Sequence, residues 1–486
     1  MSTEIRRDFD AIVVGSGPNG LAAAITLQEN GLSVLLLEGK DEIGGGLRSA
    51  ELTLPGFVHD ICSAIHPLAA GSPFFQSLPL EEHGLRFSVP EIGAAHPFDN
   101  GSAAVLAQSI EKTAVALGND RERYLRLMTP VVREWPLLAK SLLGPLKIPP
   151  HLRAMIDFGR RALLPAQVLA QRFSTVEARG LWAGMAAHSM QPLSNLVTSA
   201  VGLVLMANGH LRGWPIPLGG SRSIARALAS YFVSKGGIIE TGVYVKSLQQ
   251  LPSSRAVLFD VSPRQLLQIA GHRFSSLYRW QLEKYRYGMG VFKIDWALDD
   301  TIPFKAEECR EAGTVHLGNT FEEVAAGELA TYRGKIVEKP FVLMAQQSVF
   351  DLSRAPTGKH TAWGYCHVPH NYNGDRTEAM ERQVERFAPG FRERILARHT
   401  MNASQFEEYN PNYVGGDING GIQDIRQLFT RPALRWSPYR TSSKGLYLCS
   451  SSTPPGGGVH GMCGYYAARQ VLRDVFGIKK AIPEIH

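Results

Sequence analysis

The sequence of 486 residues is poor in cysteine and forms no cysteine motif. Its five cysteines lie at positions 62, 309, 366, 449 and 463. None forms a CxxC pair or a metal-ligand spacing, which argues against both a disulfide-exchange centre and a metal site. We expect free thiols, buried or half-buried, in a reducing compartment.

Long hydrophobic runs are also missing. No stretch reaches the ~18 apolar residues of a membrane span, and the longest candidate covers residues 196–207. The apolar run near the N-terminus is too short for the core of a signal peptide. The sequence predicts a cytoplasmic protein, and it leaves open a peripheral position on the inner face of a membrane.

Charge and motif content exclude several function classes. The formal net charge is only +7, which gives little support for a nucleic-acid partner. There is no Ser-His-Asp spacing, no HExxH motif and no phosphate P-loop, so hydrolase and kinase functions lack support.

The sequence does contain a glycine-rich turn between a short apolar strand, residues 10–14, and a helix over 21–28. The turn has the GxGxxG pattern in the context that dinucleotide-binding folds require. Its members are Gly15, Ser16, Gly17, Pro18, Asn19 and Gly20. The first glycine permits the tight turn, the second lets the backbone approach a pyrophosphate, and the third lets helix and strand pack.

A second strand, residues 33–37, ends in Glu38, 23 residues after Gly15. A carboxylate there accepts hydrogen bonds from both ribose hydroxyls and argues against a 2′-phosphate. The first 40 residues therefore predict a site for the ADP part of a dinucleotide. No second strand–GxGxxG–helix unit follows, so we expect no NAD(P)H domain. A quinone, dioxygen or another acceptor would then take the electrons.

A second glycine cluster, DEIGGGLRS at residues 41–49, directly follows. With it the sequence resembles the FAD-dependent family of amine oxidases and, more closely, phytoene desaturases, carotenoid isomerases and retinol saturases. In that family a GG motif closes over the FAD phosphates. The resemblance implies cofactor contacts from Gly44, Gly45, Gly46, Leu47 and Arg48. The family usually has arginine at position 46, so it is open whether Arg48 reaches the phosphate.

The resemblance continues at residues 217–220, 236–239 and 243–245, and it ends at 445–449 and 453–464 with a final helix over 465–474. It implies further FAD contacts from Val245, Ser451, Gly458, Gly461 and Met462. Val245 would lie beside the adenine. The amides of Gly461 and Met462 would stabilise negative charge at the N1/O2 edge of reduced flavin.

The expected fold is α/β, with a Rossmann-like FAD-binding domain built from discontinuous segments and an α+β substrate domain inserted. The FAD-binding segments are 1–89, 213–263 and 426–486. A helical region, 90–212, has expected helices at 103–117, 121–143, 152–171 and 176–188. The substrate-binding region, 264–425, has expected strands at 290–298 and 360–367 and a helix at 377–387.

Two histidines are candidate catalytic residues. His460 lies inside the C-terminal glycine loop, which the family places against the flavin, and His66 follows the GG motif on a segment that returns toward the cofactor. For each, a purely structural, hydrogen-bonded histidine is the alternative interpretation. We also expect His188 and residues 410–417 to line the substrate cavity.

The resemblance implies an FAD-dependent oxidoreductase that dehydrogenates a hydrophobic, isoprenoid or lipid-like substrate by hydride transfer to flavin N5. A saturase or double-bond isomerase, and a non-catalytic flavoprotein, stay open as alternatives. Residues 142–173 hold six basic residues, counting His151, and one acid among leucines. This mix is typical of a membrane-surface segment and equally of a solvated helix pair.

Overall fold

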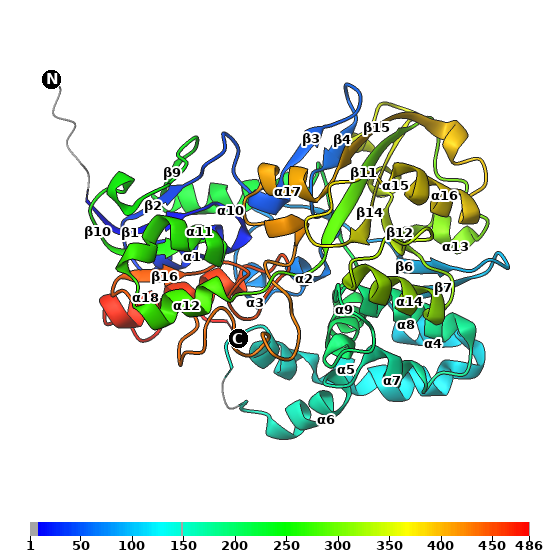
Figure 1. Ribbon diagram of the computed structural model, residues 1–486, viewed down its shortest axis with the longest axis horizontal. Helices are drawn as coiled ribbons and strands as arrows, with labels where there is room; N and C mark the ends of the chain where they lie inside the picture. Colours follow the sequence, from blue (N-terminus) through cyan, green and yellow to red (C-terminus); the bar gives the residue numbers. More distant parts are fainter. Residues whose placement is uncertain (1–7, 147–148, 486) are drawn as a thin grey trace.

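The computed structural model of the protein, which describes residues 8–146 and 149–485, contains two large sheets side by side (Figure 1). The first sheet has five parallel strands in the order β16-β10-β1-β2-β9. These are β1 (Phe9–Val14), β2 (Val34–Leu37), β9 (Ile238–Glu240), β10 (Ser254–Phe259) and β16 (Leu446–Leu448). Three distant segments of the chain therefore build one Rossmann-like sheet.

Alternate residues of β1 serve two different cores. Ala11 and Val13 pack with helices α1 (Pro18–Glu29), α10 (Arg222–Ser234) and α18 (Met462–Val475). Ile12 and Val14 face α11 (Pro263–Ala270) and α12 (Ser276–Glu283) on the other side. A strand covered on both faces must be apolar throughout, as this one is.

The two ends of the chain meet where α1 packs against α18. A Cβ atom placed on Gly464 of α18 would lie only 1.8 Å from the carbonyl oxygen of Asn19. Glycine is therefore needed for the final helix to approach the phosphate-loop helix this closely.

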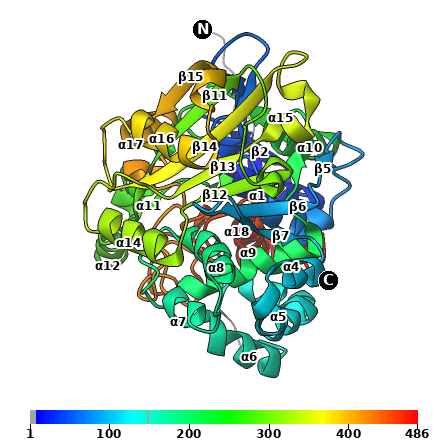
Figure 2. The same cartoon turned by 90° about the vertical axis from the view of Figure 1, so that its right-hand side faces the viewer.

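The second sheet has seven strands in the order β15-β11-β14-β13-β12-β6-β7. These are β6 (Ile92–Pro97), β7 (Ala103–Ala107), β11 (Gly290–Leu298), β12 (Ala312–Leu317), β13 (Val342–Ala345), β14 (His360–Val368) and β15 (Ile395–Met401). All neighbours are antiparallel except β12 and β6. Figure 2 shows this sheet above a helical layer.

The helical layer consists of α4 (Ile110–Ala116), α5 (Arg121–Leu142), α6 (Leu152–Ala162), α7 (Ala166–Ala170), α8 (Val176–Ala187) and α9 (Thr198–Arg212). The outer face of the second sheet carries α13 (Glu307–Arg310), α15 (Gln347–Phe350) and α16 (Thr377–Phe387), while α14 (Phe321–Tyr332) packs on α8. The remaining elements are β3 (Ser49–Glu51), β4 (Val58–Asp60), α2 (Pro67–Ala70), α3 (Pro73–Gln76), β5 (Phe87–Ser88), β8 (Ile216–Pro217) and α17 (Ala403–Tyr409).

The expected α/β class, with a Rossmann-like sheet and a separate sheet domain, is confirmed. Several boundaries differ from expectation. Residues 92–107 form β6 and β7 of the second sheet instead of a helical region, so the helix expected at 103–117 begins only at Ile110. Short apolar runs such as 103–107 do not distinguish helix from strand.

Other boundaries also move. Helices α11 and α12, residues 263–283, pack on the first sheet and not in the substrate region. The helix expected over 152–171 breaks into α6 and α7 at Pro165, because proline disfavours helical geometry in the residue before it. Residues 243–245, where the family resemblance continues, form no strand, because β9 ends at Glu240. None of the described helices is long and apolar enough to span a bilayer.

Candidate functional site

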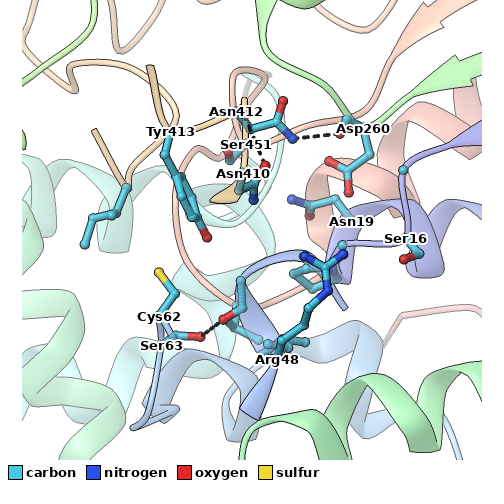
Figure 3. Close-up of a pocket in the computed structure, with 18 of the residues that line it drawn as sticks. Ser16, Asn19, Arg48, Cys62, Ser63, Asp260, Asn410, Asn412, Tyr413 and Ser451 are labelled. Carbon is cyan, nitrogen blue, oxygen red and sulfur yellow. Dashed lines mark hydrogen bonds between the residues drawn. The ribbon is translucent and has the colours of Figure 1, made fainter. Parts of the chain in front are cut away.

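One cavity runs from the glycine turn after β1 to the face of the second sheet, and both sheets contribute to its lining. Figure 3 shows the nucleotide end, where side chains from the N-terminal segment, from β10 and from residues 410–413 point toward a common space. The carboxyl ends of parallel strands, where Rossmann-like folds bind ligands, form this end.

The glycine turn provides an open cradle. Gly15 has φ +100°, and Gly17 precedes the first helical residue of α1 with no side-chain cap. A Cβ atom on Gly17 would lie 2.7 Å from Oδ2 of Asp260, and one on Gly20 would lie 1.9 Å from the carbonyl oxygen of Gly15. Side chains are thus excluded from both positions, and the helix N-terminus is left available for an anion, as FAD requires.

Glu38 stands at the end of β2, buried beside the turn. Its Oε2 accepts hydrogen bonds from the amide and hydroxyl of Ser16, at 3.0 and 2.5 Å. Its Oε1 accepts from the Lys40 amide and from the guanidinium of Arg48, 3.0 Å away. Arg48 therefore holds the Glu38 carboxylate in the cavity wall. The structure shows Arg48 paired with Glu38, and its contact with a phosphate stays a prediction.

The second glycine cluster folds over the first. The Gly44 amide donates to the carbonyl and hydroxyl oxygens of Ser16, both at 3.1 Å, and a Cβ on Gly45 would lie 3.1 Å from the Cα of Gly17. Gly45, Gly46 and Leu47 line the cavity, whereas Gly44 supports them from behind. This arrangement fits a motif that closes over phosphates.

Asp260, at the end of β10, was not among the predicted residues. Its Oδ2 accepts a hydrogen bond from the Gly20 amide at 2.9 Å, and the side chain lines the cavity beside the glycine turn. Burial raises its pKa to about 7; the charge of Glu38 acts in the same direction, and the Gly20 hydrogen bond opposes both. The sequence feature that could have identified Asp260 is its position directly after a parallel strand, where Rossmann-like folds bind ligands.

Residues 409–413 cover this end of the cavity. The Tyr409 hydroxyl donates to the Gly45 carbonyl at 3.1 Å, and the Asn412 amide donates to the Asp260 carbonyl at 3.1 Å. Of the segment predicted to line a substrate cavity, residues 410–413 do line it, close to the nucleotide end. Asp417 instead accepts from the backbone amides of Gly288 and Gly421.

The C-terminal loop reaches the cavity through Ser451, Gly458 and Val459. Gly461 and Met462 do not line it. A Cβ on Gly461 would press on Phe75, and the Met462 amide donates to Nδ1 of His460 at 3.0 Å. That amide is therefore occupied by a side chain, which corrects the expectation that it faces the flavin.

His460 is buried within its own loop and lies outside the cavity lining. Burial lowers its pKa to about 4, while the carbonyls of Gly456 and Gly457 act in the opposite direction. Its own carbonyl accepts from the Ser72 hydroxyl at 2.6 Å. These contacts match the structural alternative, a histidine that braces the loop, and a direct chemical role for His460 stays a prediction.

His66, in contrast, lines the cavity. The Ser221 hydroxyl donates its proton to the Ser63 carbonyl at 2.6 Å, so the 2.8 Å contact between Ser221 and Nε2 of His66 must use a proton on the imidazole. Nδ1 is then unprotonated, and it has no partner among the described residues. Burial lowers the pKa to about 4, so His66 is a neutral proton acceptor.

The far end of the cavity, here called the far chamber, lies against the second sheet. It is lined by Thr314, Leu343, Trp363 and Tyr365 from the sheet, by Leu205 of α9, and by His188 and Trp214, which follow the C-terminal ends of α8 and α9. His188 was expected here. Val245, expected beside the adenine, lines the nucleotide end together with Val243 and Tyr244.

Comparisons with known proteins agree with this geometry. Residues 13–77 match the family model of the NAD(P)-binding Rossmann-like domain. The chain is 27% identical to pyridine nucleotide-disulfide oxidoreductase domain-containing protein 2 of Mus musculus, covering 97% of this chain and 94% of that protein. It is 24% identical to the lycopene-forming phytoene desaturase of Pseudescherichia vulneris, covering 93% and 96%. Putrescine oxidase bound to putrescine superposes with a TM-score of 0.61 at 14% identity, covering 97% and 100%.

The fold and the cradle define an FAD-dependent oxidoreductase. Within that class, the chain is similar in sequence to a phytoene desaturase and in fold to an amine oxidase. The residues fit FAD: the N-terminus of α1, where Gly17 adds no side chain, for the pyrophosphate, a buried carboxylate for the ribose, and a C-terminal glycine loop farther along the same cavity.

Proposed function

We propose that the protein dehydrogenates a hydrophobic, isoprenoid or lipid-like substrate, with FAD as the hydride acceptor at N5. The observation that carries this proposal is the continuity of the cavity from the nucleotide cradle to the far chamber, where Leu68, Leu205 and Leu343 contribute apolar walls. FAD supplies the two-electron chemistry when it is bound.

The chain's own residues contribute orientation, exclusion of water and one proton acceptor. The apolar walls of the far chamber hold a carbon skeleton. We propose that His66, which lines the cavity and whose Nδ1 has no partner among the described residues, accepts a proton from the substrate carbon next to the one that loses hydride. A proton removed in this way and a hydride removed to the cofactor together form one carbon–carbon double bond.

An anaerobic experiment tests the direction of the reaction. Oxidised and photoreduced FAD-loaded protein are each mixed with phytoene and with lipid extracted from the purified protein. Bleaching of oxidised flavin at 450 nm supports the proposal. Turnover only by the reduced flavin would identify a saturase, and isomerised product without net bleaching would identify an isomerase. No spectral or chemical change with any lipid would favour a non-catalytic flavoprotein.

We further propose peripheral contact with a membrane through α6. Leu152, Ile156 and Leu163 are about half exposed and recur at helical spacing, flanked by the exposed Arg153 and Arg160. Helix α6 packs on α9, whose Leu205 lines the far chamber. A lipid-like substrate taken from the bilayer would therefore have a short path to the cavity.

A further inference from the structure

The far chamber carries polar side chains that find no partner in the protein. Thr314 on β12 is fully buried, and its hydroxyl makes no hydrogen bond with any described residue. The indole N–H of Trp363 on β14 is equally unpartnered. Both residues line the cavity. A buried hydroxyl or N–H without a partner destabilises the folded protein, and a ligand that pairs with it removes this cost.

The two groups share one face of the sheet. Thr314 lies opposite Ala345 of β13, and Ala345 lies opposite Trp363 of β14. Two strand spacings separate their backbones by about 10 Å, a gap that two side chains on either side of one ligand can close. Leu343 and Tyr365 complete this part of the wall.

A pair of neighbouring histidines, His188 and His316, contributes a third polar group to the far chamber. Nε2 of His188 lies 3.0 Å from Nε2 of His316, which follows Thr314 by two residues on the same strand face. Nδ1 of His316 has no partner and is packed against Gly184. An orphaned lone pair is less costly than an orphaned N–H, so His316 carries its proton on Nε2 and donates it to His188.

The proton of His188 then lies on Nδ1, where it meets no acceptor among the described residues, and His188 lines the cavity. Burial lowers the pKa of His188 to about 3 and also lowers the pKa of His316, so both rings are neutral. The far chamber thus presents hydrogen-bond donors from neutral side chains, and the buried Lys293 over the Trp363 ring is paired with Asp295. Among the described lining residues, the cations Lys40 and Arg48 are at the nucleotide end.

We propose that the substrate carries a neutral oxygen acceptor, a ketone or ester carbonyl on an otherwise apolar skeleton, and that Thr314, Trp363 and His188 bind this oxygen. The inference rests on the proposed function for the place of the substrate and deepens it by naming a substrate class. A pure hydrocarbon would leave three donors unpaired. A carboxylate would find no unpaired cation in the lining of this chamber, and an ammonium group, which has no acceptor, would leave the N–H groups of Trp363 and His188 unpaired.

Binding of matched probes to the FAD-loaded protein tests this without turnover. The probes are 2-decanone, n-decane and decanoate, each displacing the fluorescent apolar dye N-phenyl-1-naphthylamine. Each Kd is divided by the aqueous solubility of its probe. This ratio removes the free energy of transferring the carbon chain out of water, so that the probes differ only in how their polar group is bound. We expect the ketone to bind about tenfold more tightly than the alkane on this scale, and decanoate to bind most weakly.

Variants of Thr314 test whether the preference for the ketone over the alkane depends on its hydroxyl. Thr314→Val removes the hydroxyl at constant shape and should reduce the ketone preference about fivefold, whereas Thr314→Ser should retain it. Thr361→Val is the matched control, because Thr361 is a buried threonine of the same sheet with an unpartnered hydroxyl outside the cavity lining. Equal binding of ketone and alkane, tightest binding of decanoate, or an equal effect of both valine variants would overturn the inference.

The two proposals fail separately. If no lipid reduces the flavin but the ketone preference and its dependence on Thr314 hold, the binding inference stands and the dehydrogenase proposal falls. If lipids reduce the flavin while ketone and alkane bind alike, the dehydrogenase proposal stands and the oxygen acceptor is rejected.

Discussion

The nucleotide end and the far chamber of the same cavity are built by different means. At the nucleotide end, glycines and backbone amides shape the surface, and a side chain at Gly17 or Gly20 would collide with neighbouring atoms. In the far chamber, side chains from β12, β14 and the helical layer define the surface. A backbone-built site leaves a local signature in the sequence, whereas a side-chain-built site depends on which strands become neighbours.

The most severe way to break the nucleotide end is Gly17→Val. Its Cβ would lie 2.7 Å from Asp260 Oδ2, where it would fill the cradle. We expect loss of bound FAD altogether, seen as the absence of absorbance at 450 nm in protein with normal circular dichroism. Gly327→Val is the control, because only one side-chain atom lies within 4 Å of its added Cβ. A yellow Gly17→Val protein would contradict the cradle.

Alanine variants of the two candidate histidines test which part of the cavity contributes to the chemistry. His66→Ala should retain FAD and slow flavin reduction in the anaerobic assay about 100-fold, because the free Nδ1 acceptor is lost. His460→Ala should retain most of the rate and lower the melting temperature, because it removes the acceptor of the Met462 amide. The reverse pattern would assign the chemistry to the C-terminal loop.

Asp260 makes the nucleotide end sensitive to pH. Its carboxyl is neutral below its raised pKa of about 7 and negative above it, beside the place of the negatively charged pyrophosphate. FAD affinity should therefore fall as pH rises, with Kd increasing about tenfold between pH 7 and pH 8.5. Fluorescence titrations measure this, and Asp260→Asn should give a nearly flat profile. An equally steep profile in that variant would exclude Asp260.

The smallest expected effect concerns access to the far chamber. On vesicles containing anionic lipid, Arg153→Gln and Arg160→Gln should each weaken sedimentation with the membrane about fivefold, since a basic residue near such a surface contributes about 1 kcal/mol. Arg279→Gln, on an exposed part of α12, is the control. If neither arginine variant changes sedimentation with the vesicles, or if the control loses as much binding, membrane contact through α6 is rejected.

The nucleotide end was largely predictable because its chemistry is local. Gly15 to Gly20 act within one turn, and Glu38 follows at a fixed distance along the same strand–helix–strand unit. Gly461 and Met462, also expected to contact FAD, lie outside the cavity lining, and the Met462 amide donates to the imidazole of His460, two residues earlier. The glycine motif does not specify the orientation of that imidazole.

The sequence by itself determined the α/β class and the cofactor cradle, because glycine spacing and strand-end acids follow directly from backbone sterics. The convergence of both chain ends on one sheet was implied by the family resemblance. Only the tertiary structure decided that residues 92–107 join the second sheet, that Asp260 faces the phosphate turn and that Thr314, Trp363 and His188 share one chamber. These features depend on which distant segments of the chain become neighbours, and local sequence preferences do not specify this.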